Sequence, residues 1–283
     1  MILALLAGLA SAGAWTRPAG GYYAKLGFDL YVAPEYVSPV TATPGASTGG
    51  TNGFRGEAIG AVVELGILDP EVWRVQVGVG VPLTIGHTQF AFGSAFGRTA
   101  GHTQVVRVGD VRITPQIALH PKLPLAAALE VKVPAYRNDT VCADNPYRVY
   151  CPRPGEGQVD YTPHALAGLA SGDFFGELLA GWRIRTDQVI GAEAPVSPLG
   201  DGPVWAVTGG WDVSDVLLIA RVEGNHVLGE DLVTPQAVRA GPAVLWTFDA
   251  DRGLALEGRF AADVWARGTS RGLGGGVGLS ARR

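Results

Sequence analysis

Apolar and polar residues alternate one by one along much of this chain. Between residues 73 and 83 every second residue is apolar, while Arg74 belongs to the other face. Residues 22–32 repeat the pattern, with Lys25 and Asp29 on the polar face. A period of two residues predicts β-strands, because successive side chains of a strand point to opposite faces.

About twelve such stretches follow one another along the chain. We predict strands over residues 22–32, 55–67, 73–83, 108–119, 125–134, 159–170, 174–185, 204–213, 216–225, 236–248, 254–267 and 273–280. Most of them approach or exceed the roughly 9 to 11 residues of a tilted membrane strand, whereas strands of soluble sheets centre near five or six. The sequence therefore predicts an all-β fold, a membrane-spanning antiparallel up-and-down β-barrel of about twelve strands.

The connections between these stretches alternate in length. Short turns are expected at residues 68–71, 120–122 and 171–173, and near Ser214 and Asp251. Long loops are expected at residues 33–54, from residue 84 to near Gln104, at 135–158 and at 186–202. Short turns face the periplasm and longer loops face outward in bacterial outer-membrane barrels. The pattern predicts a protein of the bacterial outer membrane, with both chain ends on one side.

Aromatic residues decide which face of the strands points outward. A soluble lipocalin-like barrel would bury its apolar face, but twelve strands enclose a lumen too wide for apolar side chains to fill. Aromatic side chains on the apolar face also gather near strand ends, as they do at the two membrane interfaces. We predict an aromatic girdle of Tyr22, Trp73, Phe174, Trp211, Trp246 and Phe248 near the short turns and of Trp182 and Trp205 near the long loops.

The polar face carries acidic and basic residues in comparable number. We predict a lumen lined by Lys25, Asp29, Arg74, Asp110, Arg112, Glu130, Lys132, Asp160, His164, Glu177, Arg183, Arg185, Arg221, Glu223, Arg239, Glu257, Arg259 and Asp263. Such a wall can surround a water-filled channel, or its charges can pair across the barrel and close it. Any single member can also do no more than solvate the interior.

The composition fits one barrel domain. The 283 residues include 41 glycines and 19 prolines, 47% are hydrophobic and 17% are charged, which disfavours a helical protein. The net charge is −4 and the arginines are scattered, so nucleic-acid binding is not expected. Residues 1–14 form a short apolar run that ends in Ala12-Gly13-Ala14. We predict a secretory signal peptide cleaved before Trp15 and a single domain over residues 15–283, with an N-terminal strand or a retained anchor as the alternative.

Candidate chemistry is sparse. Cys142 and Cys151 are predicted to form a loop disulfide, as suits an exported chain, and they supply too few ligands for a structural zinc site. His164 shares a face with Asp160, but no serine follows at a spacing that suggests a nucleophile and base. We therefore predict no catalytic residue, no metal, no cofactor and no enzyme activity.

Several segments resemble a known family of outer-membrane barrels. They are Gly109-Asp110-Val111-Arg112-Ile113, residues 123–134, residues 155–163 and Trp182-Arg183-Ile184-Arg185. Together they resemble the family of phenol-degradation MetA-pathway proteins over the middle and later two thirds of the chain. The resemblance implies an outer-membrane barrel that passes small apolar or aromatic compounds and carries no established catalytic residues.

The sequence favours one function and leaves two alternatives. The first hypothesis is a passive channel or transporter for small, hydrophobic or aromatic molecules through a charge-lined lumen. The second is a closed structural or adhesion barrel that acts through its outer loops, and the third is an outer-membrane lipid-modifying enzyme. The expected partners are outer-membrane lipid, a small-molecule solute and the barrel-assembly machinery.

Overall fold

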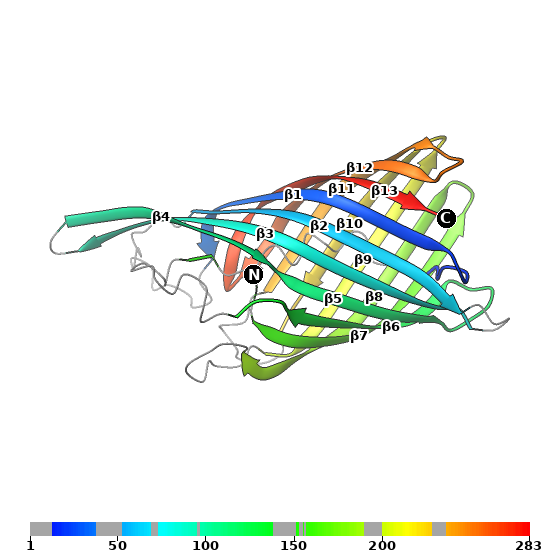
Figure 1. Ribbon diagram of the computed structural model, residues 1–283, viewed down its shortest axis with the longest axis horizontal. Coiled ribbons are helices and arrows are strands. Elements are labelled where there is room, and N and C mark those ends of the chain that lie inside the picture. The colour runs from blue at the N-terminus through cyan, green and yellow to red at the C-terminus, as the bar shows by residue number, and fades with distance from the viewer. Residues whose placement is uncertain are drawn as a thin grey trace.

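The computed structural model describes residues 13–37, 53–68, 73–94, 97–137, 151–152, 155, 157–189, 200–227 and 236–283. Its strands are β1 (Tyr22–Val37), β2 (Gly53–Leu68), β3 (Val75–Ser94), β4 (Gly97–Val108), β5 (Asp110–Ala118), β6 (Leu125–Pro134), β7 (Gln158–Ser171), β8 (Phe174–Val189), β9 (Gly202–Val213), β10 (Val216–Asn225), β11 (Gln236–Asp249), β12 (Leu254–Arg267) and β13 (Thr269–Arg282). Consecutive strands lie side by side in one sheet that curls into a barrel, except that β4 and β5 both pair with β3 (Figure 1).

The sheet is closed, because β1 pairs with β13 on one side and with β2 on the other, always antiparallel. The strands β4 and β5 occupy one position in this ring. Leu83 of β3 pairs with Val108 of β4, and Gly80 of β3 pairs with Arg112 of β5, so one extra residue lies on the β4–β5 side between these pairs. This irregularity is a β-bulge in a single long strand. The barrel therefore has twelve strand positions, which confirms the predicted fold class and strand number.

One predicted loop is wrong. The sequence predicts a long loop over residues 84–104, but β3 and β4 continue as a paired hairpin from Thr84↔Arg107 to Ser94↔Gly97. This hairpin projects beyond the rest of the barrel in Figure 1. Its glycine and polar residues obscure the alternation, yet a polar strand beyond the barrel can expose both faces to water. Hydrogen-bond pairing along the two strands, which a one-dimensional pattern does not contain, keeps the segment extended.

Tight turns gather at one end of the barrel. Gly172 and Gly253 have φ values of 58° and 64° in the turns after β7 and β11, and Ser214 has a φ of 62° in the turn after β9. The start of β1 also meets the end of β13 there, since the Tyr22 N–H donates to the Arg283 carbonyl over 3.0 Å. We call this the short-turn end, and the opposite rim the long-loop end.

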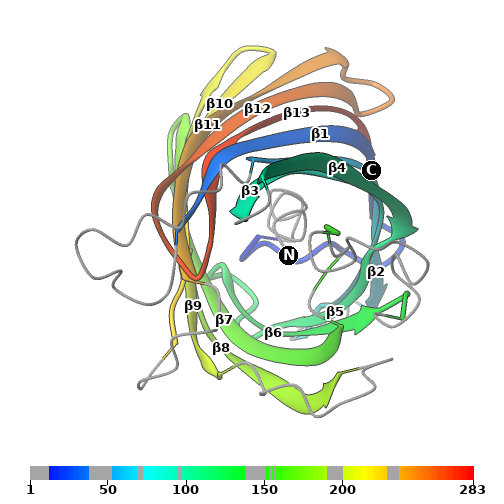
Figure 2. The ribbon, with the colours of Figure 1, turned by 90° about the vertical axis from the view of Figure 1, so that its left-hand side faces the viewer.

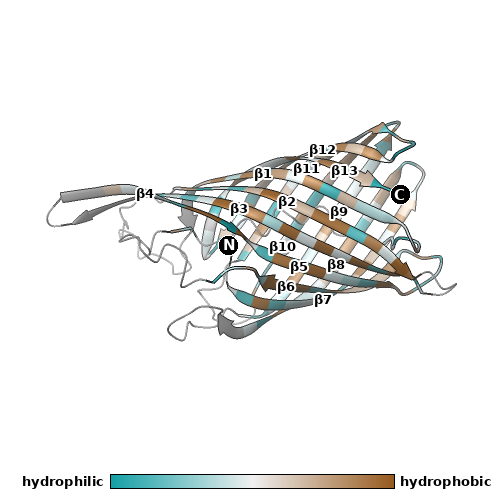
Figure 3. Cartoon of the chain, in the orientation of Figure 1, coloured by the Kyte–Doolittle hydropathy of each residue, from teal (hydrophilic) through white to brown (hydrophobic). Residues whose placement is uncertain are grey.

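The outer surface of the barrel is apolar and the inner surface is polar. Leu26, Leu169 and Val277 are 60%, 65% and 59% exposed, while their neighbours along the strands face inward. Lys25 and Asp160, by contrast, are 8% and 2% exposed. Figure 3 shows brown apolar residues along the strands seen from outside. This sidedness is the reverse of a soluble protein, which buries its apolar side chains.

Within the described part of the chain, no helix has the length and apolar character needed to cross a membrane.

Candidate functional site: the barrel lumen

The inner wall of the barrel collects most of the charged residues singled out from the sequence. The structure places these residues at partly or fully buried, inward-facing positions of the strands: Lys25, Asp29, Asp110, Arg112, Glu130, Lys132, Asp160, His164, Glu177, Arg183, Arg185, Arg221, Glu223, Arg239, Glu257, Arg259 and Asp263. Arg74 differs from this set, because it precedes β3 and is exposed at the short-turn end.

A first group of charges bridges the seam where the last strand meets the first. Lys25 of β1 and Glu257 of β12 form an ion pair of 2.6 Å, and Asp29 of β1 accepts a 2.8 Å hydrogen bond from Nε of Arg259 of β12. The strand β13 lies between β1 and β12 and carries Gly276 and Gly278 on its inner face. Since these positions have no side chains, the residues of the two flanking strands meet above them.

A buried triad extends this seam toward the long-loop end. Asp263 of β12 forms a 2.8 Å ion pair with Arg239 of β11 and accepts a hydrogen bond from the hydroxyl of Tyr31 of β1. The Gly272 N–H donates a further bond of 3.1 Å to the same carboxylate. Asp263 is 5% exposed, and its negative charge is thereby compensated by one cation and two neutral donors.

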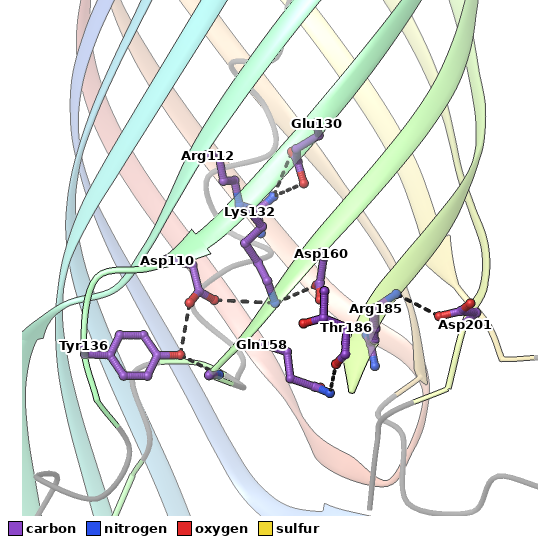
Figure 4. Close-up of polar contacts among 11 residues, drawn as sticks. Asp110, Arg112, Glu130, Lys132, Tyr136, Gln158, Asp160, Arg185, Thr186 and Asp201 are labelled. Atoms are coloured by element: carbon purple, nitrogen blue, oxygen red, sulfur yellow. Dashed lines mark hydrogen bonds and ion pairs between the residues drawn. The ribbon is translucent and has the colours of Figure 1, made fainter. Parts of the chain in front are cut away.

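A second network spans β5, β6 and β7 near the long-loop end (Figure 4). Nζ of Lys132 lies 2.6 Å from Asp160 and 3.8 Å from Asp110, so one cation stands between two carboxylates. The Tyr136 hydroxyl donates to Asp110 over 3.0 Å and accepts the Gly157 N–H over 3.0 Å. These contacts hold the segment after β6 and the segment before β7 against the inner wall.

Further polar contacts lie next to this network, some toward the short-turn end and others toward β8. Toward the short-turn end, Arg112 and Glu130 form an ion pair of 3.2 Å. Toward β8, the Gln158 amide donates to the Thr186 carbonyl over 2.6 Å, and the Arg185 N–H donates to Asp201 over 2.8 Å. Figure 4 shows these contacts as separate groups along neighbouring strands and the segments next to them. Charged side chains on adjacent strands have thus paired along the wall, which fixes their positions in the lumen.

A cavity of about 110 Å³ lies along the part of the lumen wall formed by β5 to β11. Its wall includes the charged residues Arg112, Glu130, Arg183, Arg221, Glu223 and Arg239, with His164, Thr114, Thr162 and Asn225, and the apolar contributors Leu179, Val204, Ala206 and Ala237. Arg221 and Glu223 pair over 2.9 Å within β10. The cavity therefore offers a small molecule both guanidinium and carboxylate groups and an apolar surface.

His164 takes part in this cavity wall. Its Nδ1 lies 3.0 Å from the Thr162 carbonyl on the same strand. Within the described residues, no group of three histidine, cysteine, aspartate or glutamate side chains is arranged to hold a metal ion.

The segment before β1, residues 13–21, enters the lumen at the short-turn end. We call it the N-terminal arm. Its Ala14 N–H donates to Glu177 of β8 over 2.6 Å, and its Arg17 guanidinium pairs with Glu64 of β2 over 3.1 Å. The arm therefore touches walls on opposite sides of the barrel, and Figure 2 shows it in dark blue across the interior of the ring.

The aromatic side chains of the proposed girdle occupy the outer surface. Trp73, Phe174, Trp182, Trp211, Trp246 and Phe248 are exposed, and Tyr22 and Trp205 are partly exposed. Some of them pack in pairs near the short turns, with the rings of Phe174 and Trp211 stacked at 5.7 Å. At the other end Trp205 lies over Gly224 and stacks on His226 at 6.4 Å.

Sequence reasoning missed several residues of the lumen and one of the outer surface. Tyr31, Glu64, Gln76, Gln116 and Tyr136 are buried inner-wall or rim residues with polar contacts. They share the inward parity of their strands or follow a strand end, so parity alone could have suggested the first four. Trp265, 40% exposed and 5.5 Å from the His226 ring, has no such signal, because a register shift in β12 turns it outward.

Two sequence expectations fall partly outside the described residues. Residues 1–12 of the expected signal peptide lie there, so the leader and its cleavage before Trp15 stay predictions. Cys142 also lies there, so its disulfide with Cys151 stays a prediction.

Comparison with known proteins places this fold among solved barrels. No protein-family model matches the chain, and no curated protein matches its sequence. The structure of the COG4313 outer membrane channel from Pseudomonas putida F1 aligns with a TM-score of 0.68 and 12% identity, over 97% of this chain and 100% of that chain. This chain therefore shares its fold with an outer-membrane channel, while membership of the MetA-pathway family stays a prediction.

Two further structures align less closely. The toluene transporter TbuX from Ralstonia pickettii has a TM-score of 0.46 and 8% identity over 93% of this chain and 90% of that chain. A FadL homologue from Pseudomonas aeruginosa has a TM-score of 0.43 and 10% identity over 93% and 90%.

Proposed function

We propose that this protein is a channel of the bacterial outer membrane that passes small molecules through its lumen. The observation that carries the proposal is the sidedness of the closed barrel, with an apolar exposed outer surface and paired charges on the inner wall. A closed barrel satisfies its backbone hydrogen bonds without a free edge, which is the requirement for crossing lipid with strands. The shared fold with a solved outer-membrane channel supports this assignment.

The outer surface supports a position of the proposed channel across the membrane, with one girdle at each interface. Exposed aromatic residues such as Phe174 and Trp211 lie near the short turns, and Trp182 and Trp265 lie toward the long-loop end. Aromatic rings of this kind prefer the two membrane interfaces. The short turns would then face the periplasm, the apolar band would contact lipid, and insertion would depend on the barrel-assembly machinery.

The cavity suggests the class of solute. Its wall combines the Arg112–Glu130 and Arg221–Glu223 ion pairs with Leu179 and other apolar contributors. Such a surface suits a small molecule with an aromatic or otherwise apolar part and at least one polar group. The charges orient the polar group, and the apolar contributors favour the rest of the molecule.

A closed barrel is the second candidate function. The observation that favours it is the N-terminal arm, which lies across the lumen and touches Glu177 and Glu64. A barrel closed in this way would act as a structural or adhesion protein through its outer loops. The two candidates differ in whether ions can cross the lumen.

Single-channel recording in planar bilayers separates them. In a salt gradient, Arg112→Glu should shift the reversal potential toward cation selectivity, because it replaces a positive charge by a negative one at the cavity wall. Arg252→Glu makes the same change of charge in the exposed turn after β11, outside the lumen, and should leave the selectivity close to that of wild type. Equal shifts in both variants would contradict conduction past Arg112. Silence from folded wild-type protein and from variants that release the N-terminal arm would favour the closed barrel.

A further inference from the structure

The N-terminal arm is fastened to the rim of the barrel before it enters the lumen. The Gly20 N–H donates to the Gly66 carbonyl of β2 over 3.0 Å, and the Gly66 N–H donates to the Gly21 carbonyl over 2.8 Å. A side chain at Gly66 would place its Cβ 2.0 Å from the Pro18 carbonyl oxygen. The chain therefore runs directly over β2 at this point and turns inward from a fixed position.

Inside the lumen the arm first contacts β2 and β3. The Arg17 N–H donates to Oε1 of Gln76 over 2.8 Å, while the Arg17 guanidinium binds Oε2 of Glu64 through two nitrogens at 3.1 and 3.2 Å. The same guanidinium lies 5.1 Å from the centre of the Tyr23 ring. Glu64 and Gln76 are 2% and 1% exposed. The carboxylate is therefore buried against its cationic partner in the arm, which makes the ion pair a strong local anchor.

The arm then reaches across the lumen, from Gln116 beside Gln76 to Glu177 of β8. The Ala14 N–H donates to Glu177 of β8 over 2.6 Å, and the Gln116 amide of β5 donates to the Gly13 carbonyl over 2.8 Å. These bonds satisfy one N–H and one carbonyl of the arm's main chain within the lumen. They also use side chains from two more strands.

The Trp15 indole packs against the lumen wall at Gly168 of β7, where the wall has no side chain. At Gly168 of β7, the three atoms nearest to an added Cβ all belong to the Trp15 indole, at 2.7 to 3.0 Å. The Trp15 ring also meets the Phe175 ring edge to face, with centroids 6.1 Å apart and planes at 86°. An inward-facing glycine beside an aromatic ring thus forms a seat for the indole.

We infer that the short-turn end of the lumen wall is a binding site for the chain's own N-terminal arm, and that the bound arm is a releasable plug of the channel. The site consists of Glu64, Gln76, Gln116, Glu177 and the Gly168 seat. The arm is held by side-chain contacts and by hydrogen bonds of its own backbone, and it does not pair with the barrel strands beyond Gly20 and Gly21. Its release therefore leaves the barrel pairing intact and opens the short-turn mouth.

Cleavage of the expected leader before Trp15 would remove the contacts of Gly13 with Gln116 and of Ala14 with Glu177, and would keep those of Trp15 and Arg17. The mature chain would keep Trp15 on its seat and Arg17 on Glu64 and Gln76. Its new α-ammonium group would lie one residue from the place where the Ala14 N–H meets Glu177. The Glu177 carboxylate would then have a cationic partner in the arm, in place of a neutral one.

The test uses the purified, folded protein, whose N-terminus is first read by mass spectrometry. One variant, Glu64→Gln with Glu177→Gln, removes both anionic anchors while it keeps the side-chain size. A second, Gly168→Leu, places a side chain where the Trp15 indole lies, because the three atoms nearest to an added Cβ there all belong to that ring. Gly60→Leu is the matched control, because it adds the same side chain to the inner face of β2 at a position with open space around it.

Two measurements are made on each protein. Hydrogen–deuterium exchange of the arm should be slow in wild type and about tenfold faster in both arm-releasing variants, because each loses contacts to charged or aromatic partners. Planar-bilayer recording should show higher conductance or more frequent opening in the same two variants. Gly60→Leu should neither speed the exchange of the arm nor raise the conductance or the frequency of opening.

The outcomes distinguish this inference from the proposed channel function on which it rests. Fast exchange of the arm in wild type would overturn the plug. Faster exchange in the variants with conductance equal to that of a conducting wild type would also overturn it. If the arm is protected in wild type and released in the variants, but no protein conducts, the arm-binding site stands and the channel function fails.

Discussion

The Lys25 ammonium of β1 and the Glu257 carboxylate of β12 lie 2.6 Å apart, on the two sides of the strand β13 that separates them. The pair is possible because the inner face of β13 carries glycine there. A Cβ on Gly278 would lie 2.8 Å from Cε of Lys25. The first and last segments of the barrel are thus joined by backbone hydrogen bonds and also by side chains that cross over the closing strand.

The substitution Lys25→Met should destabilise the folded barrel by about 3 kcal/mol, because it leaves the Glu257 carboxylate buried without its cation. Both side chains are largely buried, at 7% and 8% exposure, so water can compensate little of the loss. Urea unfolding of the protein in lipid vesicles, followed by tryptophan fluorescence, measures the difference.

The double variant Lys25→Met with Glu257→Leu completes a thermodynamic cycle. It should cost less than the sum of the two single substitutions, since no uncompensated charge remains. Strictly additive costs would show that the two residues do not interact in the folded protein.

The substitution Gly276→Ala should destabilise the barrel and disturb the neighbouring contact between Asp29 and Arg259. Its Cβ would lie 2.8 Å from the Phe28 carbonyl oxygen and even closer to the Asp29 carboxylate, so the backbone of β1 or β13 must shift. We expect a loss of about 1 to 3 kcal/mol, in the range of overpacked interiors. Gly258→Ala on β12 is the control, because nothing lies within 4 Å of its added Cβ. Equal stabilities of the two variants in urea would show that a side chain at Gly276 does not clash with β1.

The substitution Tyr31→Phe should cost about 1.5 to 3 kcal/mol, because it removes a hydrogen bond to the buried Asp263 carboxylate. Tyr161→Phe removes the same hydroxyl from an outward-facing ring that is 41% exposed, and its effect should be small. The two variants are ranked by the temperature at which the folded protein converts to the unfolded form, as read from a denaturing gel. A Tyr161→Phe variant as unstable as Tyr31→Phe would argue against a specific role for the Asp263 contact.

A pair of neighbouring arginine substitutions tests which face of the barrel meets lipid. Val207, in the middle of β9, is 50% exposed on the outer surface, and Thr208 next to it faces the lumen. Val207→Arg should destabilise the protein in bilayers by about 2 to 4 kcal/mol, whereas Thr208→Arg should cost less because its charge can reach water or Glu177. Chemical unfolding from vesicles gives both values. A larger cost for Thr208→Arg would reverse the assignment of the faces.

The alternation of apolar and polar residues determined the strands of this protein and which side chains face inward. The predicted strands at residues 216–225 and 254–267 have the bounds of β10 and β12, and the number of strand positions is the predicted twelve. The same parity placed Lys25 and Glu257 on the inner face. Period-two alternation is a local property, since each side chain takes its face from its place in its own strand.

The tertiary structure decided the contacts between distant residues and the strand register, which the alternation along a strand does not specify. The partners Lys25 and Glu257 are far apart in sequence, and only barrel closure together with the glycines of β13 brings them into contact. The register shift in β12 turned Trp265 outward, and pairing extended β3 and β4 through an expected loop. The place of Trp15 in the lumen likewise depends on Gly168 and Phe175, on strands distant in sequence. Register, closure and the space left by a missing side chain are relations between distant segments, so they exist only once the chain has folded.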